Sequence, residues 1–588
     1  MATKTQLGAP FTADYSQAYS ISGNIFKRRG AWFSLMCRNT EYGSAELRLI
    51  THHGGKIQAK DKEKLLDIYP TFGGNKVPFS IQAELSQLTV HTRHGQIRFT
   101  FADATLLLAE GDPGMGLKLE KQMEQHETVK PRAGGAWEGA FRCSESLIFK
   151  GLLGSGFTFG DRTWSWEKLS SGDVCGVTTP DADGRFTLAI EEFTHAGHLR
   201  PAYPGFREAR ESMQADWEDY NRAFAPFRAD LQAKGQLARY TQWAYLLEPR
   251  GPLLHKMLLM LPTDLCSQWQ LCENAVALGE RMDLALELLL APLDRAAADG
   301  QLSDVYDDVF AIRQMYKPPV HGWAVLELMK THDLMQECPR EKLEQLYDLM
   351  GRWGDWFMLN RDDDHDGLPA YEHGDETGFD DCTLFRDHIS VTAPDLSAYL
   401  VLLFEAEGKL AQLLGKPEAD SWLQKSQALL NRMLALLWDG EQFCGLVPGT
   451  GERLYSDSVI HFLPLVLGDR LPGKVLDAMT DRLMSDAGFL TPYGVASESI
   501  YSDYYHPAGM SMARGYILPP AMIFLCTGLL ESARREEGKQ LAERYCRALG
   551  EGNFPFLMNP IRGGSGFFGG TWPCCAYTIL ASKLSQAD

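Results

Sequence analysis

The first 205 residues contain short runs in which apolar and polar residues alternate. In residues 97–101 (IRFTF) the apolar side chains occupy every second position, and the large apolar side chains of residues 186–190 (FTLAI) do the same. A period of two is typical of a strand with one buried face. The run from Leu88 to His91 leads into residues 97–101 through a turn at 93–96, which predicts a hairpin, and a turn at 183–184 precedes the second run. The pattern predicts an antiparallel β-sandwich over residues 1–205.

From about Phe206 onward the apolar residues recur at helical spacing. Residues 206–235 are rich in helix formers and are predicted to form a linker helix between two domains. Helices that alternate with long loops over residues 236–588 can close into a ring of helix pairs or stack as a solenoid. The periodicity alone does not distinguish the ring from the solenoid. Further helical segments are predicted at 325–358, 394–414, 418–438, 472–486, 519–537 and 538–549.

Length and charge narrow the possible functions. A chain of 588 residues exceeds what one hydrophobic core usually organises, which favours two large domains. The formal net charge of −20 argues against a nucleic-acid partner, because phosphate binding needs clustered Lys and Arg. The sequence has no run of about 18 uncharged apolar residues, and so no membrane span is expected.

The expected compartment follows from the N-terminus and the cysteines. Residues 1–19 lack a basic segment followed by an apolar one, and so no secretory signal is predicted. The 12 cysteines have no repeated spacing, which favours free thiols and a cytoplasmic location. The adjacent pair Cys574–Cys575 leaves a zinc site open as a possibility, although buried thiols that pack as small apolar groups are the common case.

Residues 360–385 (NRDDDHDGLPAYEHGDETGFDDCTLF) form a loop dense in acidic side chains. Asp362, Asp364 and Asp366 alternate before Gly367, as carboxylates do in the first half of a Ca²⁺ loop. These three residues are therefore candidate ligands of a structural Ca²⁺, and an Asp-rich turn with a solvated face is the alternative. No other cofactor is expected.

The second half of this loop places carboxylates beside aromatic residues. A glycoside hydrolase needs one carboxylic acid that protonates the leaving oxygen and a second carboxylate that activates water or attacks. Glu376, Asp380 and Asp381 are candidates for these roles, while Tyr371 and Phe379 offer flat apolar surfaces on which pyranose rings pack. A helix N-terminus decorated with capping acids is the alternative.

Two later loops carry further candidates. Residues 489–520 contain Glu498 and Arg514 among several tyrosines, and residues 550–575 are rich in glycine and aromatic residues. Arg514 could bind a substrate carboxylate through two parallel hydrogen bonds, and an internal salt bridge is the alternative. The residues predicted to contact a sugar are Tyr371, His373, Glu376, Arg514, Trp323 and Trp572. The histidines of the β-rich half are expected at the surface: His52, His53 and His91.

Taken in order, these segments resemble the mannosylglycerate hydrolase-like branch of glycoside hydrolase family 63. Residues 362–371 are similar to the family's D-x-D-x-DGLP-x-Y motif, and residues 376–383 (ETGFDDCT) are similar to its ESGWDNS motif. The resemblance covers roughly residues 240–585 in one consistent order. Further similar segments are 317–323 (KPPVHGW), 395–400 (DLSAYL) and 493–499 (YGVASES), with Arg514-Gly515 downstream.

This resemblance implies an all-α (α/α)6 barrel behind the β-sandwich and an inverting mechanism on an α-linked small glycoside or oligosaccharide. It implies that Asp380, at the family's WDNS position, protonates the leaving oxygen, and neighbouring aromatic side chains are expected to desolvate this carboxyl group. In some members of the family the DGLP-type loop holds Ca²⁺.

The sequence departs from the family at the position of the base. The family's E-x-Y-x-P-x-T-G segment corresponds to residues 556–563 (FLMNPIRG), which contain no carboxylate. Glu551 is the first candidate for the base and Glu498 is the second. Two sugar-contacting positions also differ, since Met512-Ala513 stands for a YW pair and Trp269-Gln270 for a WD pair.

Three functions follow from these observations. The first is an inverting α-glycosidase, and the second is a sugar-binding protein that keeps the barrel but has lost the base. The third is a different sugar chemistry on the same barrel, such as epimerisation or a thiol-dependent glycosidase.

Overall fold

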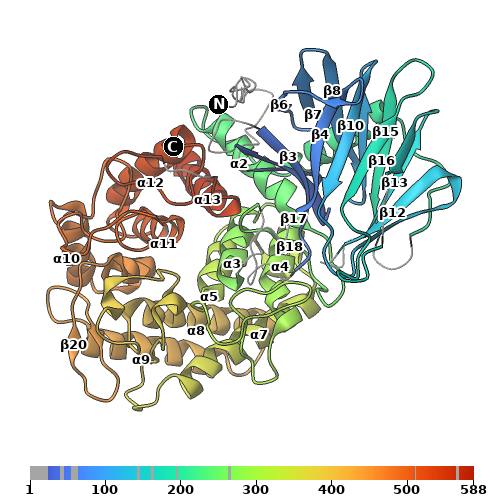
Figure 1. Ribbon diagram of the computed structural model, residues 1–588. Coiled ribbons are helices and arrows are strands. Elements are labelled where there is room, and N and C mark those ends of the chain that lie inside the picture. The colour runs from blue at the N-terminus through green and yellow to red at the C-terminus, as the bar shows by residue number, and fades with distance from the viewer. Residues whose placement is uncertain are drawn as a thin grey trace.

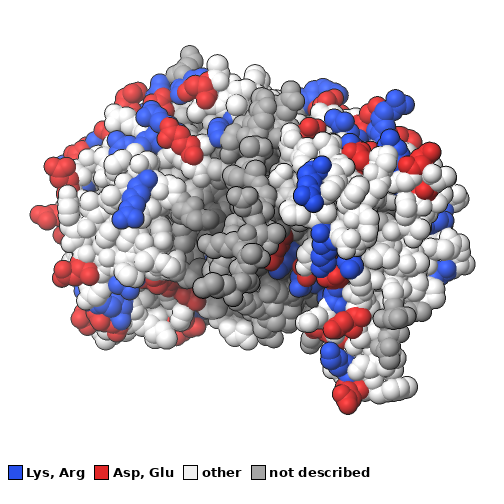
Figure 2. All heavy atoms as spheres, turned by 45° about the horizontal axis from the view of Figure 1, so that its top comes forward, with Lys and Arg blue, Asp and Glu red and all other residues white. Residues whose placement is uncertain are grey.

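The computed structural model describes residues 24–39, 45–54, 64–141, 146–160, 164–193, 197–262, 267–509, 511–564 and 568–587. An N-terminal region of antiparallel sheets precedes a helical domain, as the two periodicities predict, and the two regions lie side by side (Figure 1). None of the described helices has both the length and the apolar character that a membrane span needs. On the face shown in Figure 2, acidic and basic side chains of the described residues are interspersed.

The N-terminal region contains two eight-stranded antiparallel sheets. The predicted hairpin before Phe101 is present, with Leu88 opposite Phe99. The first sheet has the order β1 (Ile25–Phe26), β2 (Phe33–Asn39), β3 (Ala45–Thr51), β4 (Lys64–Phe72), β10 (Met115–Lys121), β15 (Val174–Thr179) and β14 (Gly156–Phe159), with β5 (Asn75–Lys76) paired to β4. The second has the order β11 (Thr128–Pro131), β12 (Ala136–Ala140), β13 (Ser146–Leu152), β16 (Phe186–Glu192), β9 (Leu106–Gly111), β8 (Gly95–Asp103), β7 (Leu88–Thr92) and β6 (Ser80–Ala83).

Aromatic side chains join the two sheets. Phe149 on β13 stacks with Phe157 on β14 at a centroid distance of 5.3 Å, and Phe33 on β2 contacts Phe101 on β8 at 5.3 Å. These residues are the inward members of alternating runs, and all four are almost completely buried. The alternation of the sequence therefore marks the face of each sheet that packs on the other.

The segment 206–235, expected as one linker helix, contains one helix and the start of another. Helix α1 (Phe206–Arg222) packs against β8 of the second sheet, whereas α2 (Gln232–Tyr245) packs against the C-terminal helix α13 (Thr571–Ala587). The connection between the two regions thus lies between α1 and α2.

Six helices of the C-terminal region contact one another in a closed ring. Every residue of one of them, α11, is buried, which agrees with a sequence (PPAMIFLCTGLL) that is apolar on all sides. Because the last helix of the series returns to the first, the arrangement is a ring rather than an open stack. In order, the ring consists of α3 (Gln268–Ala277), α5 (His321–Met329), α8 (Pro394–Leu414), η6 (Val459–Arg470), α11 (Pro519–Leu530) and α13.

A second layer of helices covers this ring from outside. Its members pack against ring helices and are amphipathic where they are exposed, as the buried positions of α9 illustrate. They are α2, α4 (Met282–Leu290), α7 (Arg340–Asn360), α9 (Ala419–Leu437), α10 (Gly473–Met484) and α12 (Arg535–Glu551). Short elements complete the chain: η2 (Ala133–Gly135), β17 (Leu246–Leu247), β18 (Met257–Leu258), η3 (Ala291–Arg295), α6 (Leu334–Glu337), η4 (Gly374–Thr377), η5 (Thr383–Phe385), β19 (Gly445–Leu446) and β20 (Arg453–Leu454).

The expectation that His52 and His53 lie at the surface is wrong. Both are buried, because the end of β3 is covered by a loop of the helical domain that contributes Asp308. His91 is half-buried. The sequence pattern of β3 alone could not predict that His52 and His53 are buried, since the loop that covers them lies far along the chain.

Candidate functional site

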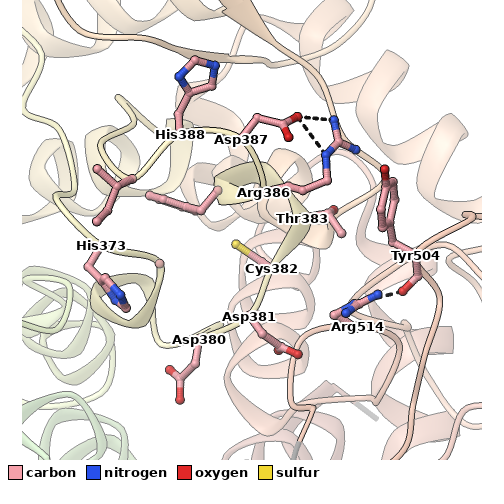
Figure 3. A pocket seen from close by; sticks show the side chains of 13 residues that line it. His373, Asp380, Asp381, Cys382, Thr383, Arg386, Asp387, His388, Tyr504 and Arg514 are labelled. Atoms are coloured by element: carbon pink, nitrogen blue, oxygen red, sulfur yellow. Dashed lines mark hydrogen bonds and ion pairs between the residues drawn. The ribbon is translucent and has the colours of Figure 1, made fainter.

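A cavity of about 600 Å³ opens between the loop that follows α7 and the loop that precedes α11 (Figure 3). In this view Asp380 and Asp381 lie along one edge, and Arg386, Asp387 and His388 lie along the opposite edge. Its lining is mixed in charge and contains hydroxyl, imidazole, carboxylate and guanidinium groups. The lining residues are His373, Gly374, Asp380, Asp381, Cys382, Thr383, Phe385, Arg386, Asp387, His388, Ile389, Tyr504 and Arg514.

The loop that carries Asp380 is held against the ring of helices. Gly378 adopts a φ of 76°, and a Cβ atom there would lie 1.5 Å from the Trp269 ring of α3. Phe379 is fully buried and its ring also contacts Trp269. Only glycine fits this close approach. The backbone on the N-terminal side of Asp380 is therefore fixed by the core.

Asp380 lines the cavity, but its surroundings differ from the expected aromatic ones. Its side chain is 39% exposed, and its Oδ1 atom lies 3.4 Å from Nζ of Lys317. Lys317 belongs to the KPPV segment that precedes α5, and its side chain reaches under the loop to meet this carboxylate. An ion pair therefore stands where an apolar, desolvated environment was expected.

Asp304 joins the same charged group. Its Oδ2 atom is 3.8 Å from Nζ of Lys317, which also donates a hydrogen bond to the carbonyl oxygen of Asp375. Burial raises the pKa of Asp304, Lys317 opposes this shift and the carboxylate of Asp380 adds to it, so that the pKa is about 6. Neither Asp304 nor Lys317 was singled out from the sequence. The one available signal was a charged residue directly before the PPV motif.

Asp381 connects the two loops that form the cavity. It accepts a hydrogen bond of 2.5 Å from the Ser511 hydroxyl and one of 2.7 Å from the backbone N–H of Ala513. Arg514, the next residue, donates from Nε to the carbonyl oxygen of Tyr504 at 3.1 Å. Asp381 thereby links the two loops, and it also lines the cavity.

The opposite edge of the cavity carries residues that the sequence analysis missed. Arg386 forms an ion pair with Asp387, and its guanidinium carbon lies 4.6 Å from the centre of the Tyr504 ring. His388 follows on the same segment. Nothing in the spacing of these residues indicated that they line a cavity, because the stretch 384–389 has no helical or strand period.

Among the predicted sugar contacts, His373 and Arg514 line the cavity together with Asp380. His373 is half-exposed, and its Nδ1 atom accepts a hydrogen bond from the backbone N–H of Asp375 at 3.1 Å. These three residues come from two loops that lie far apart in the sequence. Their convergence agrees with the order of motifs on which the resemblance rests.

The other predicted sugar contacts lie in the core and do not line this cavity. The Tyr371 hydroxyl donates to Oδ2 of Asp395 at 2.9 Å, and burial raises the pKa of Asp395 to about 7. Trp323 donates to the Thr527 hydroxyl at 3.3 Å. Trp572 donates to Glu273 at 2.7 Å. Trp323 and Trp572 thus pack within the ring near the starts of α5 and α13, and Tyr371 is held by Asp395 of α8.

Glu376 also has a structural partner. Its carboxylate is buried and paired with Arg361 through two hydrogen bonds, of 2.8 and 3.2 Å. A third hydrogen bond comes from the backbone N–H of Glu372 at 2.8 Å. Burial raises the pKa of Glu376, although Arg361 opposes this shift. The prediction that Glu376 contacts a sugar does not agree with this position.

Glu551 is not brought to the cavity. It is the last residue of α12, it is exposed, and it lines a separate cavity together with Arg228, Lys234 and Tyr577. That cavity shares no lining residue with the one around Asp380. A role for Glu551 as the base is therefore at odds with the structure, because α12 continues to this residue and no bulge carries it toward Asp380.

Glu498, the second candidate for the base, lies closer to the cavity. Its carboxylate is buried and accepts hydrogen bonds from the hydroxyls of Thr383 at 2.8 Å and of Ser502 at 2.6 Å. Thr383 belongs to the wall of the main cavity, and Glu498 lines an adjoining cavity of about 260 Å³. Burial raises the pKa of Glu498, and the hydrogen bonds from the two hydroxyls oppose this shift.

The three aspartates of the DGLP loop converge as a cation site would require. Each of Asp362, Asp364 and Asp366 offers one oxygen atom, and these atoms lie within 4.8 Å of one another. Oδ2 of Asp364 also accepts a hydrogen bond of 2.6 Å from the backbone N–H of Gly449, which links the loop to the β19–β20 turn. Carboxylate oxygens suit a hard cation such as Ca²⁺. Ca²⁺ at this loop stays a prediction.

The cysteines give no support to a zinc site. Cys574 and Cys575 are buried on α13, and burial raises the pKa of the Cys574 thiol. Cys575 donates to the carbonyl oxygen of Trp572 at 3.0 Å. Within the described part of the chain, the aspartate group is the one set of three or more acidic, His or Cys side chains that converges on a possible ion. Cys266 lies outside the described residues.

Comparison with known proteins decides the class of this site. Residues 293–565 match the model of the mannosylglycerate hydrolase MGH1-like glycoside hydrolase domain. The matched residues make up most of the helical region. The family resemblance of the motifs is thereby confirmed, and the glycosidase class with it. Asp380, His373 and Arg514 all fall inside the matched residues of the MGH1-like domain.

Solved structures are similar to this chain in fold. A GH63 mannosylglycerate hydrolase from Thermus thermophilus is similar with a TM-score of 0.50 and 16% identity, over 59% of this chain and 99% of that one. A bacterial glucoamylase complexed with acarbose is similar with a TM-score of 0.64 and 11% identity, over 98% of this chain and 95% of that one. At these identities the likeness concerns the fold alone. No curated protein matches the chain.

Proposed function

We propose that this glycosidase is an inverting hydrolase that acts on an α-linked small glycoside or oligosaccharide, with Asp380 as general acid. Its framework is an (α/α)6 barrel, formed by the ring of six helices and their outer layer, beside a β-sandwich formed by the two facing sheets. The similarity to the glucoamylase over nearly the whole chain supports this pairing of domains.

The position of Asp380 is the observation that carries the proposal. It lies in the stretch ETGFDD inside the matched residues, and it is a part-exposed carboxylate at the edge of a cavity of about 600 Å³. The loop before it is fixed against Trp269, so the carboxylate has a defined place from which to meet a glycosidic oxygen. A general acid must be held in this way to reach the leaving group.

Glu498 is the proposed base of this enzyme. It is linked to the cavity wall through Thr383, and burial raises the pKa of its carboxyl group, which improves its affinity for a proton taken from water. An inverting enzyme needs room for one water between its base and the sugar, with the two carboxyl groups about 6.5–9.5 Å apart. The smaller cavity beside Glu498 offers space for such a water.

The charged groups around the cavity favour a small polar substrate. Arg514 uses Nε for its described contact with Tyr504, and this arrangement suits binding of a carboxylate by the terminal nitrogens. A glycoside of an organic acid therefore fits the cavity, as does a short neutral saccharide that hydrogen-bonds His373 and Asp387. The described cysteines are all free, which fits the reducing cytoplasm as the site of action.

A substrate panel tests this function. Purified protein is incubated with natural disaccharides, malto-oligosaccharides, glucosylglycerate and mannosylglycerate, and the anomer first released is followed by NMR. The expected result is turnover of at least one α-glycoside with an inverted product, which Asp380→Asn abolishes. A retained product, or full activity of the Asp380→Asn variant, would overturn the proposed mechanism.

A sugar-binding protein without turnover is the second candidate. The non-acidic stretch at 556–563 and the ion pair between Lys317 and Asp380 favour it. Calorimetric binding of a saccharide without release of any product over many hours would select this alternative. Turnover that depends on Asp380 would exclude it.

A further inference from the structure

Lys317 lies between two carboxylates, and one of them is the proposed general acid. Its Nζ atom is 3.4 Å from Oδ1 of Asp380 and 3.8 Å from Oδ2 of Asp304. The side chains of Lys317 and Asp304 are 13% and 8% exposed, against 39% for Asp380. The ammonium group is therefore a buried bridge that joins a buried carboxylate to the one that lines the cavity.

The bridge has fixed ends. Lys317 donates a third contact to the carbonyl oxygen of Asp375, in the same loop as Asp380. The backbone carbonyl of Asp304 accepts the N–H of Gln268, the first residue of α3, at 3.2 Å. Lys317 and Asp304 thus connect the cavity loop to a helix of the ring. Proline at the next two positions restricts the backbone after Lys317.

The contacts of Lys317 limit the directions in which the side chain of Asp380 can point. Asp304 does not line the cavity, and its Oδ1 atom has no hydrogen-bond partner among the described residues. Its contribution is therefore to attract the ammonium group of Lys317, not to touch a substrate. A displacement of about 1 Å in a reacting group is enough to lower a rate by about a hundredfold.

We propose that Lys317 and Asp304 are positioning residues for Asp380. The proposal rests on the proposed function, because it takes Asp380 as the group that meets the glycosidic oxygen. Lys317 holds the carboxylate of Asp380 at the cavity edge, and Asp304 holds Lys317 in place. Removal of either one leaves the binding groups His373 and Arg514 intact but lets Asp380 rotate away from the reacting bond.

Kinetics of three variants test this assignment. Lys317→Gln is expected to lower kcat at least about tenfold with KM within about threefold, because Asp380 loses its partner while the binding groups stay in place. Lys317→Arg keeps the charge and is expected to recover part of the loss, and Asp304→Asn is expected to fall between wild type and Lys317→Gln. The matched control is Lys425→Gln, whose partner Asp355 lies on the outer layer of helices. Lys425→Gln is expected to keep the kcat of wild type.

Crystal structures of wild type and Lys317→Gln decide the same question without any activity measurement. The expected difference is a changed side-chain direction of Asp380 in the variant, with the loop backbone unchanged. An unchanged Asp380 direction together with the kcat of wild type would overturn the assignment. A wild-type protein that turns over no glycoside would refute the proposed function instead, and the crystal structures would still decide the positioning. If Lys317→Gln does not fold, Lys317→Arg and Asp304→Asn replace it in both measurements.

Discussion

The Nδ1 atom of His53, just after β3, lies 2.7 Å from Oδ2 of Asp308 in the helical domain. The Nε2 atom of the same ring lies 3.1 Å from Oε1 of Glu192 at the end of β16, and the ring stacks on Trp32 at 4.9 Å. The backbone N–H of Gly54 donates to Oδ1 of Asp308 at 2.8 Å. The β-rich region therefore contacts the loop that also carries Asp304.

Replacement of His53 by Gln is expected to weaken the contact between the two regions. Glu192 and Asp308 would lose the ring that joins them, and a buried hydrogen-bonding group left without its partner costs about 1–3 kcal/mol, although Glu192 keeps its ion pair with Arg250. Urea denaturation should report this loss, and kcat should fall with it because the loop of Asp304 loosens. His198→Gln, at an exposed position of the same region, is the control and should stay within about 0.5 kcal/mol. A His53→Gln protein with the stability of wild type would contradict this role.

The fold could be predicted where local pattern and tertiary contact agree. The alternation in residues 97–101 gave the correct hairpin partner, and the all-apolar helix α11 is a completely buried member of the ring. His53 shows where this reasoning ends. Its burial depends on a loop more than two hundred residues away, and a short polar run beside a strand resembles any surface turn.

The site could be predicted only as far as its motifs reach. Asp380 and Arg514 lie in stretches with an ordered counterpart in the family, and His373 lies between two such stretches. Tyr371 and Glu376 lie in the same motifs, yet their partners Asp395 and Arg361 hold them in the core. A motif identifies a segment of chain, but the direction of each side chain depends on contacts that the segment does not contain.

The buried carboxyl group of Glu407 is expected to make the stability of the protein depend on pH. It is buried on α8, neither of its carboxylate oxygens has a hydrogen-bond partner among the described residues, and burial raises its pKa to about 9. The folded protein therefore keeps a proton that the unfolded chain releases above about pH 4.5. Between these two values the folded state binds more protons, so that its stability falls as the pH rises.

Glu407→Gln should remove this dependence. The variant is expected to match wild type near pH 5 and to be more stable by about 4 kcal/mol near pH 8, because Gln has no proton to lose. Urea denaturation at several pH values checks this, with the exposed Glu418→Gln as control. Parallel stability curves for wild type and Glu407→Gln across this range would show that Glu407 titrates normally.

The three aspartates of the DGLP loop are expected to make the Tm of the protein depend on Ca²⁺. A cation held by Asp362, Asp364 and Asp366 binds the folded state alone, so millimolar Ca²⁺ should raise Tm by a few degrees and a chelator should reverse the rise. Asp366→Asn is expected to lose most of this response. Asp363→Asn, an exposed neighbour outside the group of three, should keep it. An identical Tm of wild type with Ca²⁺ and with chelator would leave this loop as an Asp-rich turn.

The identity of the base is tested by a pair of variants, Glu498→Gln and Glu551→Gln. Glu498 is buried beside Thr383 of the cavity wall, whereas Glu551 lines a separate cavity at the end of α12. On a substrate found in the panel, Glu498→Gln is expected to lower kcat by about a thousandfold, since it removes the group that activates water, while Glu551→Gln keeps the rate of wild type.

Added azide should restore part of the rate in Glu498→Gln, because a small anionic nucleophile needs no base. The rescue separates a lost base from a damaged fold, which azide cannot repair. Full activity of Glu498→Gln would assign the base to another residue and reject the role proposed for Glu498.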